Sequence, residues 1–281
     1  MSCGGEGVEW AGRLLNADGR VLMTECRLNV YTLPGQASPA ELAGGTVVVI
    51  DVLRATTTII HALEAGATEV VPCLEVADAQ ALAANAPRGQ YVLGGERGGL
   101  PIPGFDLGNS PTDYTPESVK GKTVIFTTTN GTRAMMHCRQ ADRVLIGAFV
   151  NASAVVDRLA GQPEVHLVCA GSAGKVTLDD VLFAGFVVER LVAGRDSRYR
   201  LNAQAAAATK QWRLAFPAPL AEGAEAAQPE LLAVELRKGL AGQRLVAIGM
   251  ADDILTAAQI DRFRSAPEMD PRTLRIRLAC D

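Results

Sequence analysis

Val-Val-Val-Ile-Asp-Val-Leu-Arg-Ala-Thr-Thr-Thr, residues Val47–Thr58, is the segment from which the architecture of this chain is best predicted. Its four leading β-branched residues carry no polar break, which predicts a central strand buried on both faces of a sheet. Asp51 and Arg54 follow at the strand's end, where open α/β sheets bind their ligands. A predicted helix, Ala55–Ala65, begins with the hydroxyls of Thr56–Thr58, and its free N–H groups favour an anion. An alternative stays open, in which Asp51 only caps this helix and Arg54 pairs with a surface acid.

Short apolar strands and helices alternate along the rest of the chain. Further strands are predicted at Arg27–Leu33, Glu69–Leu74, Gln90–Leu93, Lys122–Phe126, Arg143–Ala148, Val165–Cys169 and Thr273–Ala279. Helices are predicted at Val76–Asn85, Ala134–Arg139, Asn151–Leu159, Val181–Val192, Asn202–Leu214 and Pro229–Leu240, with a linker at Pro217–Gln228 and a last helical stretch opening at Gly249. This βαβ alternation predicts the α/β fold class.

Composition excludes several classes of protein. The 281 residues are 48% hydrophobic and 5% aromatic, with a formal net charge of −4 and no basic run, so nucleic acid is not an expected partner. No apolar run reaches the roughly 18 to 20 residues that cross a bilayer, and Met1–Trp10 is glycine-rich and acidic. We therefore expect a cytoplasmic protein without a membrane partner. Six cysteines without a Cys-x-x-Cys pair argue against a zinc knuckle or a disulfide framework.

A long segment, Gly94–Pro111, shows neither helical nor strand periodicity and is rich in glycine and proline. Connections of this length within a compact domain are uncommon and are often functional. Glu96 and Arg97 follow the end of a predicted strand, and their flanking glycines allow close approach of a ligand. Asn109 and Ser110 add further polar groups, although Asn-Ser-Pro is equally good turn chemistry.

Two more glycine turns follow predicted strands. Thr127–Arg133 reads Thr-Thr-Thr-Asn-Gly-Thr-Arg before a helix, an arrangement that can surround an oxyanion or simply cap the helix. Gly171–Lys175 is a flexible turn that could receive an anion. Asp179 and Asp180 then stand at a helix start, where plain capping carboxylates are the alternative.

Four such turns in one alternating α/β chain would place their groups at the same edge of a sheet. Carboxylate ligands for Mg²⁺, arginines for phosphate or sulfonate, and N–H groups for phosphoryl oxygens together suit phosphoryl chemistry. The pattern therefore predicts a site for a phosphorylated small acid and a divalent cation.

The motifs in these turns closely resemble those of the 2-phosphosulfolactate phosphatase family. The resemblance is strong over about Val47–Val192 and weaker over Gly239–Asp261. The motifs that carry it are Asp-Val-Leu-Arg-Ala-Thr-Thr-Thr, Gly-Gly-Glu-Arg with Gly-Phe-Asp-Leu-Gly-Asn-Ser-Pro, Thr-Thr-Thr-Asn-Gly-Thr-Arg-Ala, and Cys-Ala-Gly-x-x-Gly with Leu-Asp-Asp.

This resemblance implies a Mg²⁺-dependent phosphatase, a phosphoric monoester hydrolase that converts 2-phospho-3-sulfolactate to 3-sulfolactate and phosphate on the route to coenzyme M. It also implies the family's own layered α/β/α fold with a largely parallel or mixed sheet. We expect that domain to span residues 27–281 after an N-terminal extension, residues 1–26. An alternative division has two α/β subdomains that meet near residues 150–200. A homodimer is also expected.

The resemblance and the residue types together assign roles to the predicted site. Mg²⁺ is assigned to Asp51, Glu96 and Asp180, and Asp51 is the first choice for general base if it is not a ligand. Arg54 and Arg97 are expected to clamp the acidic groups of the substrate. The remaining predicted contacts to the substrate or its phosphoryl group are Thr56, Asn109, Thr128, Asn130, Gly131, Thr132, Gly171 and Gly174, with Asn130 counted among the catalytic residues.

Two other functions fit the same residues. One is a phosphatase for a different phosphorylated 2-hydroxy acid, since a site of this kind need not demand a sulfonate. The other is a binding protein that holds a phosphorylated or sulfonated small acid without hydrolysing it.

Overall fold

The computed structural model describes residues 26–87, 89–194, 199–217 and 229–279. Its strands form one mixed sheet in the order β5-β4-β6-β3-β11-β10-β7-β2-β8-β1-β9. Residues 1–25 of the predicted N-terminal extension lie outside the described residues, as does most of the predicted linker Pro217–Gln228. The strands are β1 Cys26–Tyr31, β2 Thr46–Ile50, β3 Glu69–Pro72, β4 Tyr91–Arg97, β5 Leu100–Pro101, β6 Thr123–Thr127, β7 Arg143–Gly147, β8 Glu164–Cys169, β9 Tyr199–Leu201, β10 Glu268–Met269 and β11 Ile276–Arg277.

The sheet consists of two parallel blocks joined by an antiparallel pair. One block is β4-β6-β3 and the other is β7-β2-β8-β1-β9, while β11 and β10 lie between them and run antiparallel to their neighbours. Within each block the carboxyl ends of the parallel strands meet at one edge. All described strands belong to this one sheet. The alternative division into two subdomains that meet near residues 150–200 stays a prediction.

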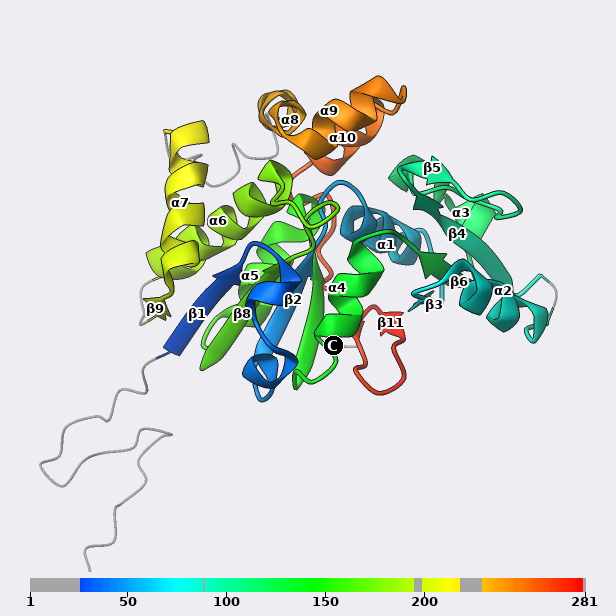
Figure 1. Cartoon of the computed structure of the whole chain (residues 1–281), viewed down its shortest axis with the longest axis horizontal. Coiled ribbons are helices and arrows are strands. Elements are labelled where there is room, and N and C mark those ends of the chain that lie inside the picture. The colour runs from blue at the N-terminus through cyan, green and yellow to red at the C-terminus, as the bar shows by residue number, and fades with distance from the viewer. Residues whose placement is uncertain (1–25, 88, 195–198, 218–228, 280–281) are drawn as a thin grey trace, which may run out of the picture.

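Helices cover both faces of the sheet (Figure 1). Strand β2 shows why two layers are needed: Val48 and Ile50 pack into one hydrophobic core with α5 and α6, and Val47 and Val49 pack into another with α1 and α4. The predicted α/β/α fold class is thus confirmed. The helices are α1 Ala55–Glu64, α2 Val76–Ala84, α3 Pro116–Val119, α4 Gly131–His137, α5 Ala152–Leu159, α6 Leu178–Ala193, α7 Ala203–Ala215, α8 Pro229–Lys238, α9 Leu240–Ala247 and α10 Asp252–Ala257.

Strand β4 is longer than predicted and corrects the assignment of Glu96 and Arg97 to a loop. The strand continues through Gly94 and Gly95, which pair with Phe126 and Thr127 of β6. A Cβ at Gly95 would lie 1.9 Å from the Thr127 carbonyl oxygen, so glycine is what allows the strands to approach here. The glycines that predicted a loop are therefore part of the sheet.

The C-terminal helices α8, α9 and α10 form a separate group, seen in orange at the top of Figure 1. Helix α9 was not predicted, because its segment is interrupted by glycine. Gly242 is needed there, since a Cβ would lie 2.2 Å from the Leu236 carbonyl oxygen of α8. Strand β10 was also missed, and the predicted C-terminal strand is reduced to β11. None of the helices within the described ranges is long and apolar enough to cross a membrane.

Candidate active site

One pocket at the carboxyl ends of the parallel strands draws residues from all four predicted turns. Asp51 comes from the end of β2, Glu96 from β4, Asn130 from the turn after β6 and Ser172 from the turn after β8. Helix α9 closes the remaining side. The pocket is lined by Asp51, Leu53, Arg54, Glu96, Gly99, Asn109, Thr129, Asn130, Ser172, Ala241, Arg244, Leu245 and Ile248.

Asp51 lies at the floor of this pocket and is 8% exposed. Its Oδ1 accepts a hydrogen bond from the Ala55 N–H of α1 at 3.3 Å, and its Oδ2 has no donor among the described residues. Burial raises the pKa of Asp51 well above its ordinary value, and the nearby Asp180 and Glu96 carboxylates raise it further. The predicted cap is present, but it occupies only one carboxylate oxygen.

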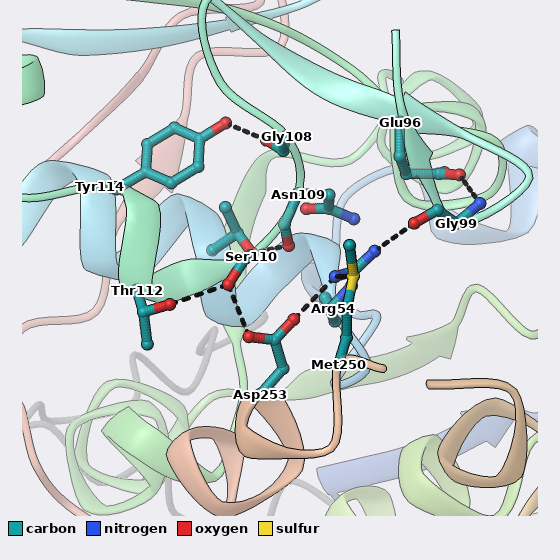
Figure 2. Close-up of polar contacts among 11 residues, drawn as sticks. Arg54, Glu96, Gly99, Gly108, Asn109, Ser110, Thr112, Tyr114, Met250 and Asp253 are labelled. Carbon is teal, nitrogen blue, oxygen red and sulfur yellow. Dashed lines mark hydrogen bonds and ion pairs between the residues drawn. The ribbon is translucent and has the colours of Figure 1, made fainter. Parts of the chain in front are cut away.

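Arg54 is held rigidly beside Asp51. Figure 2 shows its guanidinium between the Gly99 carbonyl, which accepts from Nη2 at 2.8 Å, and the Asp253 carboxylate, which accepts from Nη1 at 2.7 Å. The same Nη1 contacts the Met250 sulfur. Arg54 does pair with an acid, as the alternative reading expected, but that acid is buried in α10 rather than at the surface. Nε has no partner in the described part of the chain, so it stays available to a ligand.

Glu96 joins two of the turns. Its Oε1 accepts from the Thr129 N–H at 2.7 Å, and its Oε2 accepts from the Gly99 N–H at 2.6 Å and from the Thr129 hydroxyl at 3.2 Å. The carboxylate is 6% exposed and lines the pocket. Glu96 therefore holds the Gly98–Gly99 turn against the turn after β6 while keeping a pocket-facing position.

The predicted threonines lie around the pocket without lining it. Thr128 Oγ1 accepts from the Thr132 N–H at 3.2 Å, Thr132 donates to the Thr128 carbonyl, and Thr56 donates to the Asp51 carbonyl. All three are buried. Gly131 packs so closely on the floor that a Cβ there would lie 2.7 Å from Asp51 Oδ2. These residues shape the turns rather than expose hydroxyls.

Asn130 and Asn109 are the predicted contacts that do reach the pocket. Asn130 Oδ1 accepts from the Ala173 N–H at 3.1 Å and so ties the turn after β6 to the turn after β8. Asn109 is 5% exposed, and its Oδ1 is buried without a partner. Figure 2 shows no contact from the Asn109 amide. A buried unpaired amide is costly, so this side chain is free to bond a ligand.

Asp180 does not line the pocket. Its Oδ1 accepts from the Val52 N–H at 2.9 Å, and its Oδ2 accepts from the Gly171 N–H and the Thr177 hydroxyl. Burial raises its pKa to about 6, against the lowering effect of these donors. Neighbouring Asp179 accepts from the Leu53 N–H, and burial together with Asp180 raises its pKa well above the ordinary value. The two carboxyls therefore hold the residues that follow Asp51, and Asp180 also ties them to the turn after β8.

Three other predicted residues, Arg97, Gly171 and Gly174, also lie outside the lining. Arg97 donates to the Leu74 carbonyl and to the Thr127 hydroxyl, so its guanidinium connects β4 to the loop before α2. Gly171 and Gly174 adopt positive φ angles of 62° and 74°, and a Cβ at Gly171 would lie 2.6 Å from the Lys175 carbonyl oxygen. Both glycines shape the turn, from which Ser172 is the residue that lines the pocket.

The sequence alone did not single out Thr129, Gly99 or Arg244 as site residues, and it predicted Asp253 chiefly as a helix cap with a lesser chance of reaching the site. Thr129 and Gly99 were within the predicted turns, but Asp253 and Arg244 lie on helices about 200 residues after Arg54 in the chain. Among the described residues, no three His, Cys, Asp or Glu side chains are grouped to hold a metal ion. The predicted trio of Asp51, Glu96 and Asp180 is thus not assembled as a cage.

The pocket combines acidic groups with anion-binding groups. Asp51 and Glu96 supply carboxyl groups and Asn109 a carbonyl oxygen without a partner, while Arg54 and Arg244 supply guanidinium groups for an anion. Such a mixture suits an anionic ligand that brings a cation with it.

Known proteins are similar to this chain in sequence. The family model described as 2-phosphosulpholactate phosphatase matches residues 31–271. A probable 2-phosphosulfolactate phosphatase of Symbiobacterium thermophilum is 42% identical over 228 residues, which cover 81% of this chain and 92% of that protein. A protein of the same printed name from Deinococcus radiodurans is 37% identical over 248 residues, or 87% of this chain and 94% of its own.

Proposed function

Since the chain belongs to the 2-phosphosulfolactate phosphatase family, we propose that it hydrolyses 2-phospho-3-sulfolactate to 3-sulfolactate and inorganic phosphate with Mg²⁺ as cofactor. The family was predicted from four motifs in the right order, and the match over residues 31–271 confirms it. Membership makes the chain an enzyme, a phosphoric monoester hydrolase.

The observation that carries the proposal is the convergence of the four motif turns on one pocket. The pocket places a carboxylate oxygen without a protein donor, Asp51 Oδ2, beside the guanidinium of Arg54 and the amide of Asn109. A phosphoryl group needs donors for its oxygens and an acceptor or metal ligand for the attacking water. All of these components are present within one lining.

The contacts of the carboxylates suggest how Mg²⁺ would be held. Asp180 is not retained as a ligand, because it does not line the pocket. Asp51 and Glu96 both line it, and Asp51 keeps one oxygen free. Mg²⁺ usually takes one or two carboxylates and fills its other positions with water and substrate phosphate, so this pair fits it.

Charge supports the same conclusion. Asp51 is followed into the interior by Asp179 and Asp180, and the pKa of all three is raised by burial. Arg54 is already paired with Asp253. Bound Mg²⁺ would favour the ionised form of the carboxyl groups beside it and would stabilise the charge on the phosphoryl group of the substrate.

The chain's own residues would orient the substrate for attack by water. Arg54 Nε and the amides of Asn109 and Asn130 would donate to phosphoryl oxygens, and the Asp253 ion pair would keep Arg54 in place. The water oxygen forms the new bond to phosphorus as the bond from phosphorus to the C2 oxygen breaks. The C2 oxygen leaves as the hydroxyl of 3-sulfolactate after taking a proton, and phosphate departs.

We also propose that the reaction serves coenzyme M formation and takes place in the cytoplasm, and that the protein is a homodimer.

The direct test measures phosphate release from racemic 2-phospho-3-sulfolactate, with Mg²⁺ and with EDTA, beside 2-phospholactate and p-nitrophenyl phosphate. We expect release from the sulfonate that EDTA abolishes and added Mg²⁺ restores. Metal-dependent release of phosphate from the other esters alone would support a Mg²⁺-dependent phosphatase but exclude 2-phospho-3-sulfolactate as its substrate. Binding of the sulfonate without release from any ester would favour the binding protein.

A further inference from the structure

Arg244 is the cation at the open side of the pocket. It lies on α9, and its Nη2 donates to the Gly98 carbonyl at 2.9 Å in the turn between β4 and β5. The side chain is exposed, unlike that of Arg54, which is 4% exposed. The two arginines bond consecutive carbonyls, because Arg54 donates to Gly99. The same turn therefore orients one guanidinium at the floor and one at the rim.

The turn is shaped so that both carbonyls can accept. Gly98 and Gly99 have φ angles of +65° and +85°, a region that residues with a Cβ rarely adopt. A Cβ at Gly99 would also lie 3.3 Å from Ile248 Cδ1, next to α9. Glu96 holds this turn from the inside through the Gly99 N–H. The position of the Arg244 guanidinium is thus set by the strand end and by its own helix.

The two arginines differ in what they have left to offer. Arg54 has the buried carboxylate of Asp253 as its partner. No carboxylate in the described ranges pairs with Arg244, and one bond to a neutral carbonyl uses only one of the five N–H donors of a guanidinium. Arg244 therefore keeps its charge and most of its donors for a ligand.

We infer that Arg244 recognises the sulfonate of the substrate and so sets the preference of this site for a sulfonated 2-phospho acid. The inference rests on the proposed function, which puts the phosphoryl group at the floor beside Asp51. The sulfonate is on the carbon next to the one that carries the phosphoryl oxygen, so it can reach the rim when the phosphoryl group is at the floor. The carboxylate is on the other neighbouring carbon, and the test below separates the two groups. A planar, weakly hydrated guanidinium is well matched to an anionic group with several oxygens.

The test compares Arg244→Gln and Arg244→Lys with a matched control, Arg237→Gln, which removes an exposed arginine from neighbouring α8 outside the pocket. Steady-state kinetics are measured on 2-phospho-3-sulfolactate and on 2-phospholactate, which keeps the carboxylate but lacks the sulfonate. For Arg244→Gln we expect kcat/KM on the sulfonate to fall about tenfold or more, the effect of losing a charged hydrogen bond. The fall on 2-phospholactate should be under about twofold, and Arg237→Gln should match wild type on both.

Arg244→Lys should lie between wild type and Arg244→Gln, since it keeps the charge and loses the fork. Equal losses on both substrates would overturn the inference, because Arg244 would then act on the shared carboxylate or phosphate. Unchanged kinetics for Arg244→Gln would overturn it as well.

Product binding separates failure of this inference from failure of the proposed reaction. Calorimetric titration of 3-sulfolactate and of lactate into wild type and Arg244→Gln needs no turnover. If the enzyme releases no phosphate from the sulfonate, the proposed function fails, yet tighter binding of 3-sulfolactate that Arg244→Gln weakens about tenfold would still support the role of Arg244. Equal affinity of both proteins for 3-sulfolactate would reject that role.

Discussion

Arg54 and Asp253 form a buried ion pair that joins the end of the central strand to the C-terminal helices. The Nη1–Oδ2 distance is 2.7 Å, and the two side chains are 3% and 4% exposed. Ser110 donates to the other carboxylate oxygen of Asp253 at 2.6 Å, so the loop before α3 is tied to the same pair (Figure 2). Three parts of the chain that are distant in sequence therefore meet at this ion pair.

Removing the negative partner should damage stability and activity together. In Asp253→Asn the guanidinium of Arg54 stays buried without a carboxylate, and breaking such a pair costs about 3–5 kcal/mol. Arg54 would also lose its orientation toward the phosphoryl group, so kcat/KM should fall. Chemical denaturation and phosphate release measure the two effects.

The adjacent Asp252 provides the control, because it is exposed on the same helix. Asp252→Asn should change the free energy of unfolding by no more than about 0.5 kcal/mol. If Asp253→Asn proved as stable and as active as Asp252→Asn, the ion pair would have no such role.

Asp51→Asn should separate stability from activity. Burial and the neighbouring Asp180 raise the pKa of Asp51, so its ionised form is disfavoured in the folded state and stability falls as pH rises above the ordinary carboxyl range. The amide removes this cost, and Tm near neutral pH should equal or exceed that of wild type. Loss of the oxygen that we propose faces Mg²⁺ should lower kcat at least about 100-fold.

A Mg²⁺ titration then distinguishes the two roles considered for Asp51. If Asp51 is a Mg²⁺ ligand, replacing it should raise the Mg²⁺ concentration needed for half-maximal residual activity. If Asp51 is only a base, replacing it should lower kcat without changing that concentration. Asp142→Asn, which changes an exposed carboxylate before β7, should leave both quantities at wild-type values. Near-normal turnover of Asp51→Asn would remove Asp51 from the mechanism.

Gly131→Ala tests the packing on the pocket floor. An added Cβ would lie 2.5 Å from the Ala55 Cβ and 2.7 Å from Asp51 Oδ2, so the first turns of α1 and α4 must move apart. Such overpacking costs about 1–3 kcal/mol, and a shift of roughly 1 Å in a catalytic group can lower the rate about 100-fold. Gly35→Ala has no heavy atom within 4 Å of its new Cβ and is the control. Equal activity of the two variants would show that the floor tolerates the methyl group.

The strands that were predicted correctly are those whose own residues show a strand pattern. The β-branched run before Asp51 and the glycine turns after β6 and β8 were recognised locally, and the turns do meet in one pocket. The predicted reason, a shared edge of one parallel sheet, was wrong, because three antiparallel pairings between β3 and β7 make β6 run opposite to β2 and β8. The extension of β4 was missed because it depends on pairing with β6, a partner about 30 residues further along the chain.

Side-chain roles were harder to predict, because they depend on contacts between distant segments. Arg97 had the same local signal as Arg54, yet it donates to Leu74 and Thr127 rather than lining the pocket. Arg244 gave no signal, since it lies on a helix interrupted by glycine and reaches the site only through the packing of α9 on the Gly98 turn. Motif chemistry can identify the edge of the sheet, but only the fold decides which arginine faces the ligand.

His61 should make the protein less stable in mild acid. Its ring on α1 packs edge-on against Phe263 with centroids 4.9 Å apart, and its Nε2 has no partner in the described part of the chain. Burial, with a smaller contribution from Arg262, lowers the pKa of His61 to about 4. Between an unfolded pKa of about 6.5 and this value, the unfolded state binds a proton that the folded state excludes. The contribution to stability is thus complete above about pH 6.5 and is lost as pH falls toward 4, by about 3 kcal/mol over the whole range.

Denaturation of wild type and His61→Gln at pH 7.5, 6 and 5 measures this loss of stability. The difference in unfolding free energy between the two proteins should shift in favour of the variant as pH falls, and a difference that stays constant with pH would contradict the assignment.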